Sequence, residues 1–158
     1  MRTDGHLGLN LLLASPIVLM YPGDLTDRSL WTFLIFFLGM CAWPDIDLKF
    51  ELKHRSYTHT LLGCFIFGLI SVFIVIFARM EYIFQGFAGG FLGSLGHILG
   101  DLMTYMKFKP LWPISNREVA LGLFRSNNRK VNRLFGKIGA IVFGLTLVYK
   151  GLNPVSSP

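Results

Sequence analysis

The chain has 158 residues, a length typical of one domain. Hydrophobic residues make up 53% of it and charged residues only 15%, below the roughly one quarter that is usual in soluble domains. With fifteen Phe and only nine acids, this composition excludes a cytosolic globule, a disordered chain and a soluble nucleic-acid-binding protein. Nucleic acid is therefore not an expected partner, and the net charge of +6 is first tested as a signal of membrane orientation.

Five apolar stretches predict an all-α, polytopic membrane helical bundle with about five transmembrane or membrane-embedded helices. The stretches lie at about 7–21, 30–43, 60–78, 83–105 and 135–149. Because a full span needs about 20 apolar residues, the third and fourth stretches are long enough to cross a membrane, and the other three are short. We expect the first stretch to be retained as a helix and not cleaved as a leader, and residues 1–158 to form a single domain.

Positive charge is unevenly distributed over the two sides of such a bundle. With five spans, one side receives the N-terminus and the loops at 44–59 and 106–134. Only Arg28, Arg79 and Lys150 lie on the other side, which leaves twelve of the fifteen basic residues on the first. Because cytoplasmic loops are enriched in Lys and Arg, we expect a multi-pass protein of the cell membrane with a cytoplasmic N-terminus.

Ionisable residues gather at the same predicted cytoplasmic boundary. All four histidines lie there, together with three of the nine acids. These candidate metal ligands are His6, Asp45, Asp47, His54, His59, His97 and Asp101. Ionisable groups within membrane segments are costly and usually functional, and imidazole with carboxylate is a ligand set for Zn²⁺, with Mn²⁺ or Fe²⁺ as alternatives. Seven donors exceed one tetrahedral site, so either two metals bind or some donors orient the ligands.

The spacing of these residues supports the metal hypothesis, although each element also has a structural interpretation. His97 and Asp101, at i and i+4, share one helix face with a stripe of glycines and suit one metal; alternatively, they form a buried hydrogen-bonded pair that holds two helices together. Asp45 and Asp47 offer two oxygen donors, or alternatively a helix-capping turn. Arg55 would suit an anionic oxygen such as a phosphate ester, or it is a positive-inside anchor.

The ordered motifs resemble those of a known family. They are Gly5-His6, Pro44-Asp45-Ile46-Asp47, His54-Arg55-Ser56-Tyr57-Thr58-His59-Thr60, His97-x-x-x-Asp101-x-x-Thr104 and Pro110-Leu111-Trp112-Pro113-Ile114-Ser115. Over about residues 5–133 the chain resembles the YdjM family of LexA-regulated, membrane-bound, metal-dependent hydrolases, and its compact form is most similar to archaeal members. The resemblance implies the same seven ligands. Leu48 stands where the family often has His, and Ser56 where it often has Gly. Because the missing His removes one possible ligand, the number of bound metals, one or two, is left open.

The residues and the resemblance together predict a membrane-embedded, metal-dependent hydrolase that acts at the cytoplasmic face on a phosphoester or phospholipid-like substrate. One or two divalent ions, with zinc favoured, would lower the pKa of a bound water. Asp47 or Asp101 would act as the base or orient the ligands, and Arg55 would stabilise negative charge.

The predicted partners are membrane lipids, which the basic loop at 106–134 and its Trp112 would contact, and a small-molecule or lipid substrate. The oligomeric state is left open. One alternative is a transporter or metal-handling membrane protein, in which the same side chains bind an ion in transit. Another is a structural membrane protein in which the metal only staples helices.

Overall fold

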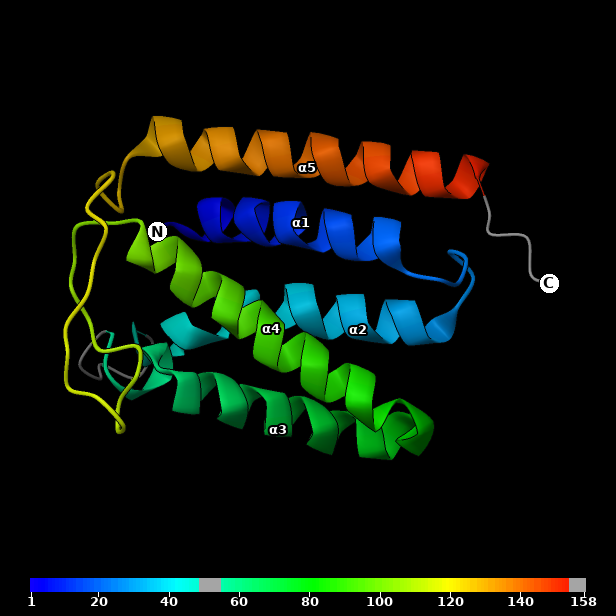
Figure 1. Cartoon of the computed structure of the whole chain (residues 1–158), viewed down its shortest axis with the longest axis horizontal. Helices are drawn as coiled ribbons and strands as arrows, with labels where there is room; N and C mark the ends of the chain where they lie inside the picture. Colours follow the sequence, from blue (N-terminus) through cyan, green and yellow to red (C-terminus); the bar gives the residue numbers. More distant parts are fainter. Residues whose placement is uncertain (49–54, 154–158) are drawn as a thin grey trace.

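The computed structural model describes residues 1–48 and 55–153, which fold into helices (Figure 1). The α-helices are α1 (Thr3–Met20), α2 (Arg28–Gly39), α3 (Leu61–Ala78), α4 (Ile83–Leu102) and α5 (Arg129–Leu152). Three 3-10 segments lie between them, namely η1 (Met40–Leu48), η2 (Tyr57–His59) and η3 (Met80–Tyr82). No strand is formed within the described ranges, so the predicted all-α bundle is confirmed.

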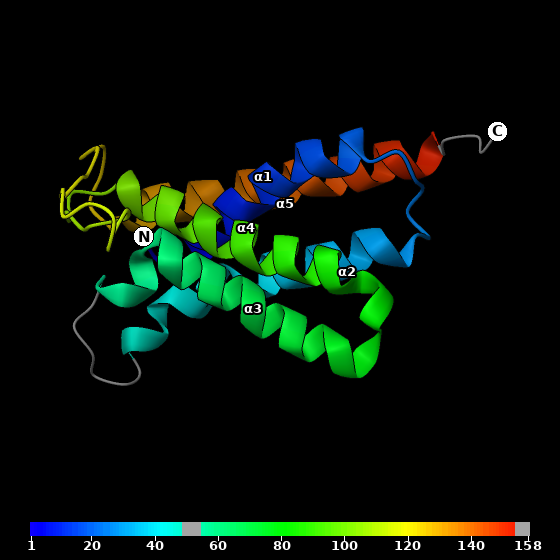
Figure 2. The ribbon, with the colours of Figure 1, turned by 60° about the horizontal axis from the view of Figure 1, so that its bottom comes forward.

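Helix α4 is the centre of the bundle. It contacts α1, α2, α3 and η1, whereas α5 packs along α1 on the outside. Figures 1 and 2 show that one end of the bundle collects the N-terminus, η1, the start of α3, the end of α4 and the start of α5. The segments that carry the predicted ionisable cluster therefore meet at a single end.

Glycines allow α4 to lie this close to its neighbours. A Cβ atom on Gly93 would collide with the backbone carbonyl of Phe37 in α2, and one on Gly90 would collide with the Ser71 side chain in α3. Gly139 of α5 similarly faces the backbone of Gly8 in α1. Small residues let helices approach closely in lipid, where there is no hydrophobic force between them. The glycine stripe thus fixes the depth at which α4 sits between α2 and α3.

Within residues 1–48 and 55–153, three helical segments are long and apolar enough to cross a membrane, judged by length and composition. They are Arg28–Asp47, which joins α2 to η1, then Leu61–Ala78, and Arg129–Leu152. The second and fifth stretches are therefore longer than the sequence pattern indicated. Helix α4 has 20 residues but is not among the three, because its glycines and the polar His97 and Asp101 lower its mean hydropathy.

Apolar packing holds the bundle at both ends. At the far end, Ala14 and Val18 of α1 are buried against Leu30, Leu34 and Phe37 of α2. A second buried cluster, near the ionisable end, contains Cys64, Ile98 and Phe108. Both Cys41 and Cys64 are buried free thiols, as expected for packing residues.

Candidate metal centre

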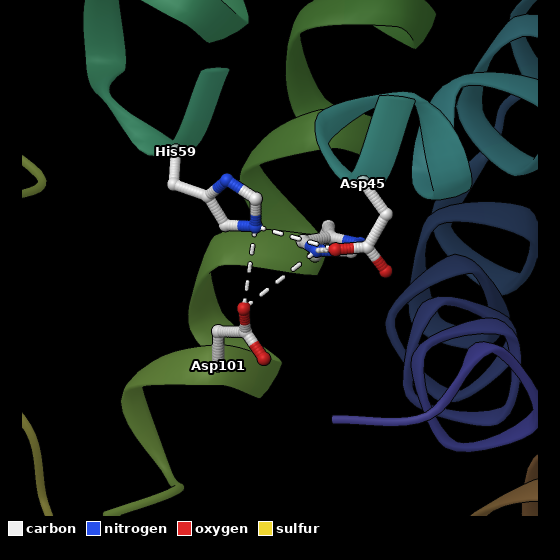
Figure 3. A group of neighbouring side chains, drawn as sticks. Asp45, His59 and Asp101 are labelled. Atoms are coloured by element: carbon white, nitrogen blue, oxygen red, sulfur yellow. Dashed lines mark ion pairs between the residues drawn. The ribbon is translucent and has the colours of Figure 1, made fainter. Parts of the chain in front are cut away.

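Four side chains from three separate segments converge at one end of α4 (Figure 3). Asp45 comes from η1, His59 from η2, and His97 and Asp101 from α4. One donor atom of each lies within 4.8 Å of the others. His59 Nε2 is 3.4 Å from both Asp45 Oδ1 and Asp101 Oδ2, and His97 Nε2 is 3.3 Å from Asp45 Oδ1 and 3.8 Å from Asp101 Oδ2.

Local structure explains how each donor is placed. His97 and Asp101 are one turn apart on α4, so both project from the same face. Asp45 lies in the 3-10 segment that continues α2 around Pro44. His59 lies just before α3, whose N-cap Thr60 accepts a hydrogen bond from the Gly63 amide and fixes where the helix begins.

The hydrogen bond of His97 leaves its other nitrogen directed at the cluster. Its Nδ1 lies 2.7 Å from the backbone carbonyl of Cys41. A carbonyl only accepts, so Nδ1 carries the proton and Nε2 carries a lone pair. Within the described residues, Nε2 of His97 has no hydrogen-bond partner. This is the arrangement of a metal-binding imidazole, which donates its second N–H to an oxygen outside the metal's own ligands.

A short relay fixes His59 in the same way. The Thr58 hydroxyl donates to Asp47 Oδ2 at 3.1 Å, and its oxygen lies 3.0 Å from His59 Nδ1. Because that hydroxyl has one proton, it accepts from Nδ1–H, so the lone pair of His59 is on Nε2. Asp47 Oδ2 is itself 3.5 Å from Nδ1. Asp47 therefore lies behind His59, on the side away from the four-donor group.

The charges around His59 shift its proton affinity. Burial lowers the pKa of His59, but the carboxylates of Asp101 and Asp45 raise it by more, and the pKa lies above its ordinary value. The two carboxylates that raise the pKa of His59 also favour a divalent cation beside its ring, because their negative charge attracts a proton and a metal ion alike.

The residues fit a divalent metal ion. Two imidazole nitrogens and two carboxylate oxygens form a ligand set that suits zinc. A tetrahedral ion with bonds of about 2.1 Å separates its ligands by roughly 3.4 Å, and four measured separations are 3.3–3.8 Å. The buried Asp101 Oδ2 and His97 Nε2 have no hydrogen-bond partner in the described part of the chain, and one cation between them would satisfy both.

His6 lies next to this group but does not belong to the four donors. Its ring stacks on His97 with the centroids 3.6 Å apart and the planes at 7°. Its Nε2 is 3.4 Å from Asp101 Oδ1, and the Met1 amino group also contacts that oxygen. Neither ring nitrogen of His6 has a hydrogen-bond partner among the described residues. His6 is therefore a further donor beside the group, and the Asp101 oxygen that it faces is already contacted by Met1 and Arg55.

Arg55 is buried beside the cluster and is bound on several sides. One terminal guanidinium nitrogen is 2.7 Å from Asp101 Oδ1, and the other donates to the Thr104 hydroxyl and the Met106 carbonyl. Its backbone amide donates to Asp47 at 3.0 Å, and its φ is +59°. A positive φ is strained for a residue with a side chain. These contacts hold the residue in that conformation and keep the guanidinium against Asp101.

The structure thus brings together six of the eight residues predicted for the site, with Asp47 behind them. The remaining one, His54, lies outside the described residues. Sequence reasoning missed the Cys41 carbonyl, which no side-chain pattern could reveal, and the role of Met106, whose backbone oxygen binds Arg55. Thr104, which the sequence motif already includes with His97 and Asp101, accepts a hydrogen bond from Arg55.

Comparison with known proteins gives a consistent result. The sequence model of a family described as "YdjM inner membrane protein" matches residues 1–153. The curated relatives include the inner membrane protein YdjM of Escherichia coli (strain K12) and the protein of the same name from Shigella flexneri. The chain is 29% identical to each over 134 residues, which cover 72% of this chain and 66% of the relative. No solved structure shows significant similarity to the chain.

Proposed function

This chain belongs to the YdjM inner membrane protein family, and from that premise we propose that it is a membrane-embedded, metal-dependent hydrolase. The observation that supports the proposal is the convergence of Asp45, His59, His97 and Asp101 beside a buried arginine at one end of the bundle. Zinc is the favoured ion, with manganese or iron as alternatives, and one or two ions are proposed, with His6 as the further donor for a second.

The proposed chemistry divides the work among named side chains. A divalent ion, when bound, supplies Lewis acidity and a water of lowered pKa. Asp47 and Thr58 position His59 through its Nδ1. Asp101 presents one oxygen to the ligand group and the other to Arg55. The Arg55 guanidinium, held beside this carboxylate, would stabilise negative charge that develops on a substrate.

The proposed substrate is a phosphoester or a phospholipid-like molecule, reached from the cytoplasmic face of the cell membrane. In a five-span topology twelve of the fifteen basic residues are expected on the side that holds the site, which favours a cytoplasmic N-terminus by the positive-inside rule. Phosphate esters suit this environment, because arginine and a divalent cation both bind phosphate oxygens. A site near the ends of apolar helices is also within reach of lipid head groups.

One observation supports a second candidate, in which the ion only staples the helices. Four protein donors fill a tetrahedral ion, as in structural zinc sites, whereas catalytic sites keep one position open. Asp45 is the relevant residue, since its side chain is 24% exposed while the other three are at most 1% exposed. If Asp45 binds the ion throughout, the staple is favoured; if water displaces it, the hydrolase is favoured.

The test is metal analysis of detergent-purified protein beside a panel of phosphoesters and phospholipids. We expect about one or two divalent ions per chain, hydrolysis of at least one panel member, and loss of both in His97→Ala. Asp24→Ala is the matched control, because Asp24 lies in the exposed turn at the far end. Full metal content in His97→Ala would refute the site. Metal-dependent ion flux in sealed liposomes without hydrolysis would instead support a transporter.

A further inference from the structure

A pocket of about 260 Å³ adjoins the metal centre and belongs to none of the roles assigned above. Arg55 and Phe108 form the wall that it shares with the centre. On the inner side, Arg55 is 2.7 Å from Asp101, and the Phe108 ring lies edge-on to the His59 ring at 6.2 Å. A ligand in the pocket would therefore be one side chain away from the four-donor group.

The lining of the pocket contains positive charge that the acids of the metal centre do not pair with. Arg55, Lys107 and Lys109 line it, against the single acid Glu118. Among the ion pairs of the described residues, none involves either lysine. The Arg55 side chain is 4% exposed, and its Nε has no hydrogen-bond partner in the described part of the chain. Its terminal nitrogens serve Asp101, Thr104 and Met106, so the two lysines are the charges that remain for a ligand.

The pocket walls are held in place by the surrounding structure. Phe108 pairs with Val119 through two backbone hydrogen bonds of 3.3 and 2.9 Å, and the Arg55 guanidinium lies over the Phe108 ring at 5.8 Å. The amide of Leu61, at the start of α3, donates to the Pro110 carbonyl at 2.8 Å. These bonds tie the loop after α4 to α3 and hold the backbone of the segment that carries both lysines.

Aromatic side chains complete the pocket. Tyr57 and Trp112 pack edge to face, with ring centroids 4.8 Å apart, and both line it. Lysines that serve only membrane orientation are not required to line a concave pocket beside aromatic side chains. Lys130 and Lys137 are of that kind, since both lie on the exposed surface of α5 at the same end.

We propose that this pocket binds a second anionic group of the substrate. The substrate class is then a phosphoester that carries another negative group, such as a second phosphate or a carboxylate, a few bonds from the phosphate at the metal centre. For the phosphate at the metal centre, this inference rests on the proposed hydrolase function. For the second anionic group, it rests on the pocket alone. Both groups could belong to a lipid head group or to a soluble molecule.

The test uses propylphosphonate, which has one anionic group, and α,ω-bisphosphonates with one to four methylenes between two such groups. Their carbon–phosphorus bonds are not cleaved by an esterase, so calorimetry on the metal-loaded protein measures binding without turnover, and metal analysis after the titration checks that the ion is retained. We expect the best bisphosphonate to bind at least about tenfold more tightly than propylphosphonate, the gain of one charge-assisted hydrogen bond. Lys107→Gln/Lys109→Gln should abolish this advantage and keep the full metal content. The control, Lys130→Gln/Lys137→Gln, removes the same charge at the same end and should retain the advantage.

The outcomes separate the two proposals. Equal affinity for one and two anionic groups, or an equal loss in both double variants, would overturn the pocket assignment. Absence of metal from the wild-type protein would overturn the hydrolase, while phosphonate binding that still depends on Lys107 and Lys109 would retain the pocket as an anion site. Nanodiscs with and without phosphatidylserine, whose head group carries a phosphate and a carboxylate, identify the source: competition by the bilayer indicates a lipid substrate, and its absence a soluble one.

Discussion

Replacement of Asp47 by alanine should weaken metal binding without abolishing it. The carboxylate accepts hydrogen bonds from the Arg55 amide at 3.0 Å and the Thr58 hydroxyl at 3.1 Å, and it lies 3.5 Å from His59 Nδ1. Asp47→Ala removes these contacts and leaves His59 Nε2 in the ligand group. Removal of such a positioning partner typically lowers metal affinity about 10- to 100-fold, which corresponds to about 1.4–2.7 kcal/mol.

Competition with a chromophoric chelator measures this affinity in detergent. Thr58→Val removes the hydroxyl of the same relay at nearly constant volume, and its affinity should fall between those of the wild type and Asp47→Ala. His97→Ala removes a ligand and should fall furthest. Thr32→Val, at an exposed position on α2, is the matched control. If Asp47→Ala lost as much affinity as His97→Ala, Asp47 would be a ligand; if it lost none, the relay to His59 would have no role.

Three further predictions follow from the packing and the charges. Chelation should lower the Tm of the wild type but not of His97→Ala, because free metal at 100 times its Kd stabilises the folded state by about 2.7 kcal/mol; a shift of equal size in both proteins would place the stabilising ion elsewhere. Gly93→Ala should destabilise the bundle by about 1–3 kcal/mol, measured by denaturation in detergent, because its Cβ would meet the Phe37 backbone, whereas Gly144→Ala has open space and should be neutral. In the chelated protein, burial lowers the pKa of His59, but Asp101 and Asp45 raise it by more, so that the pKa lies above its ordinary value of about 6.5. The stability that this charge contributes is complete below about pH 6.5 and is lost as pH rises through the higher folded-state pKa; denaturation midpoints that are independent of pH would contradict the charge pattern.

The helices were largely predictable because apolar runs determine them, but their ends were not. Helix α5 begins at Arg129, well before the apolar stretch expected at 135–149. The Asn128 side chain accepts hydrogen bonds from the Lys130 and Val131 amides and starts the helix within a charged segment. Hydropathy does not detect such a cap. Likewise, α2 continues into η1 past the end of its apolar run.

The gathering of the cluster at one end of the bundle was predictable from the sequence, but the roles within it were not. Asp45 and Asp47 were equivalent candidates in the sequence. In a 3-10 helix with three residues per turn, positions i and i+2 point about 120° apart, so one carboxylate joins the donor group while the other lies behind His59. The pattern of residues alone gave no indication of this turn type, nor of the positive φ that directs Arg55 inward.

The uneven exposure of the four donors has a kinetic consequence. His59, His97 and Asp101 are closed off from solvent, and Asp45 is the member of the group that water reaches. An ion would therefore enter and leave past Asp45, exchanging its hydration shell for protein ligands one at a time. Exchange past this one partly exposed ligand would be slower than at an open surface site. An ion acquired when the bundle assembles would then be retained, so the supply of metal at the time of membrane insertion would determine which metal the protein carries.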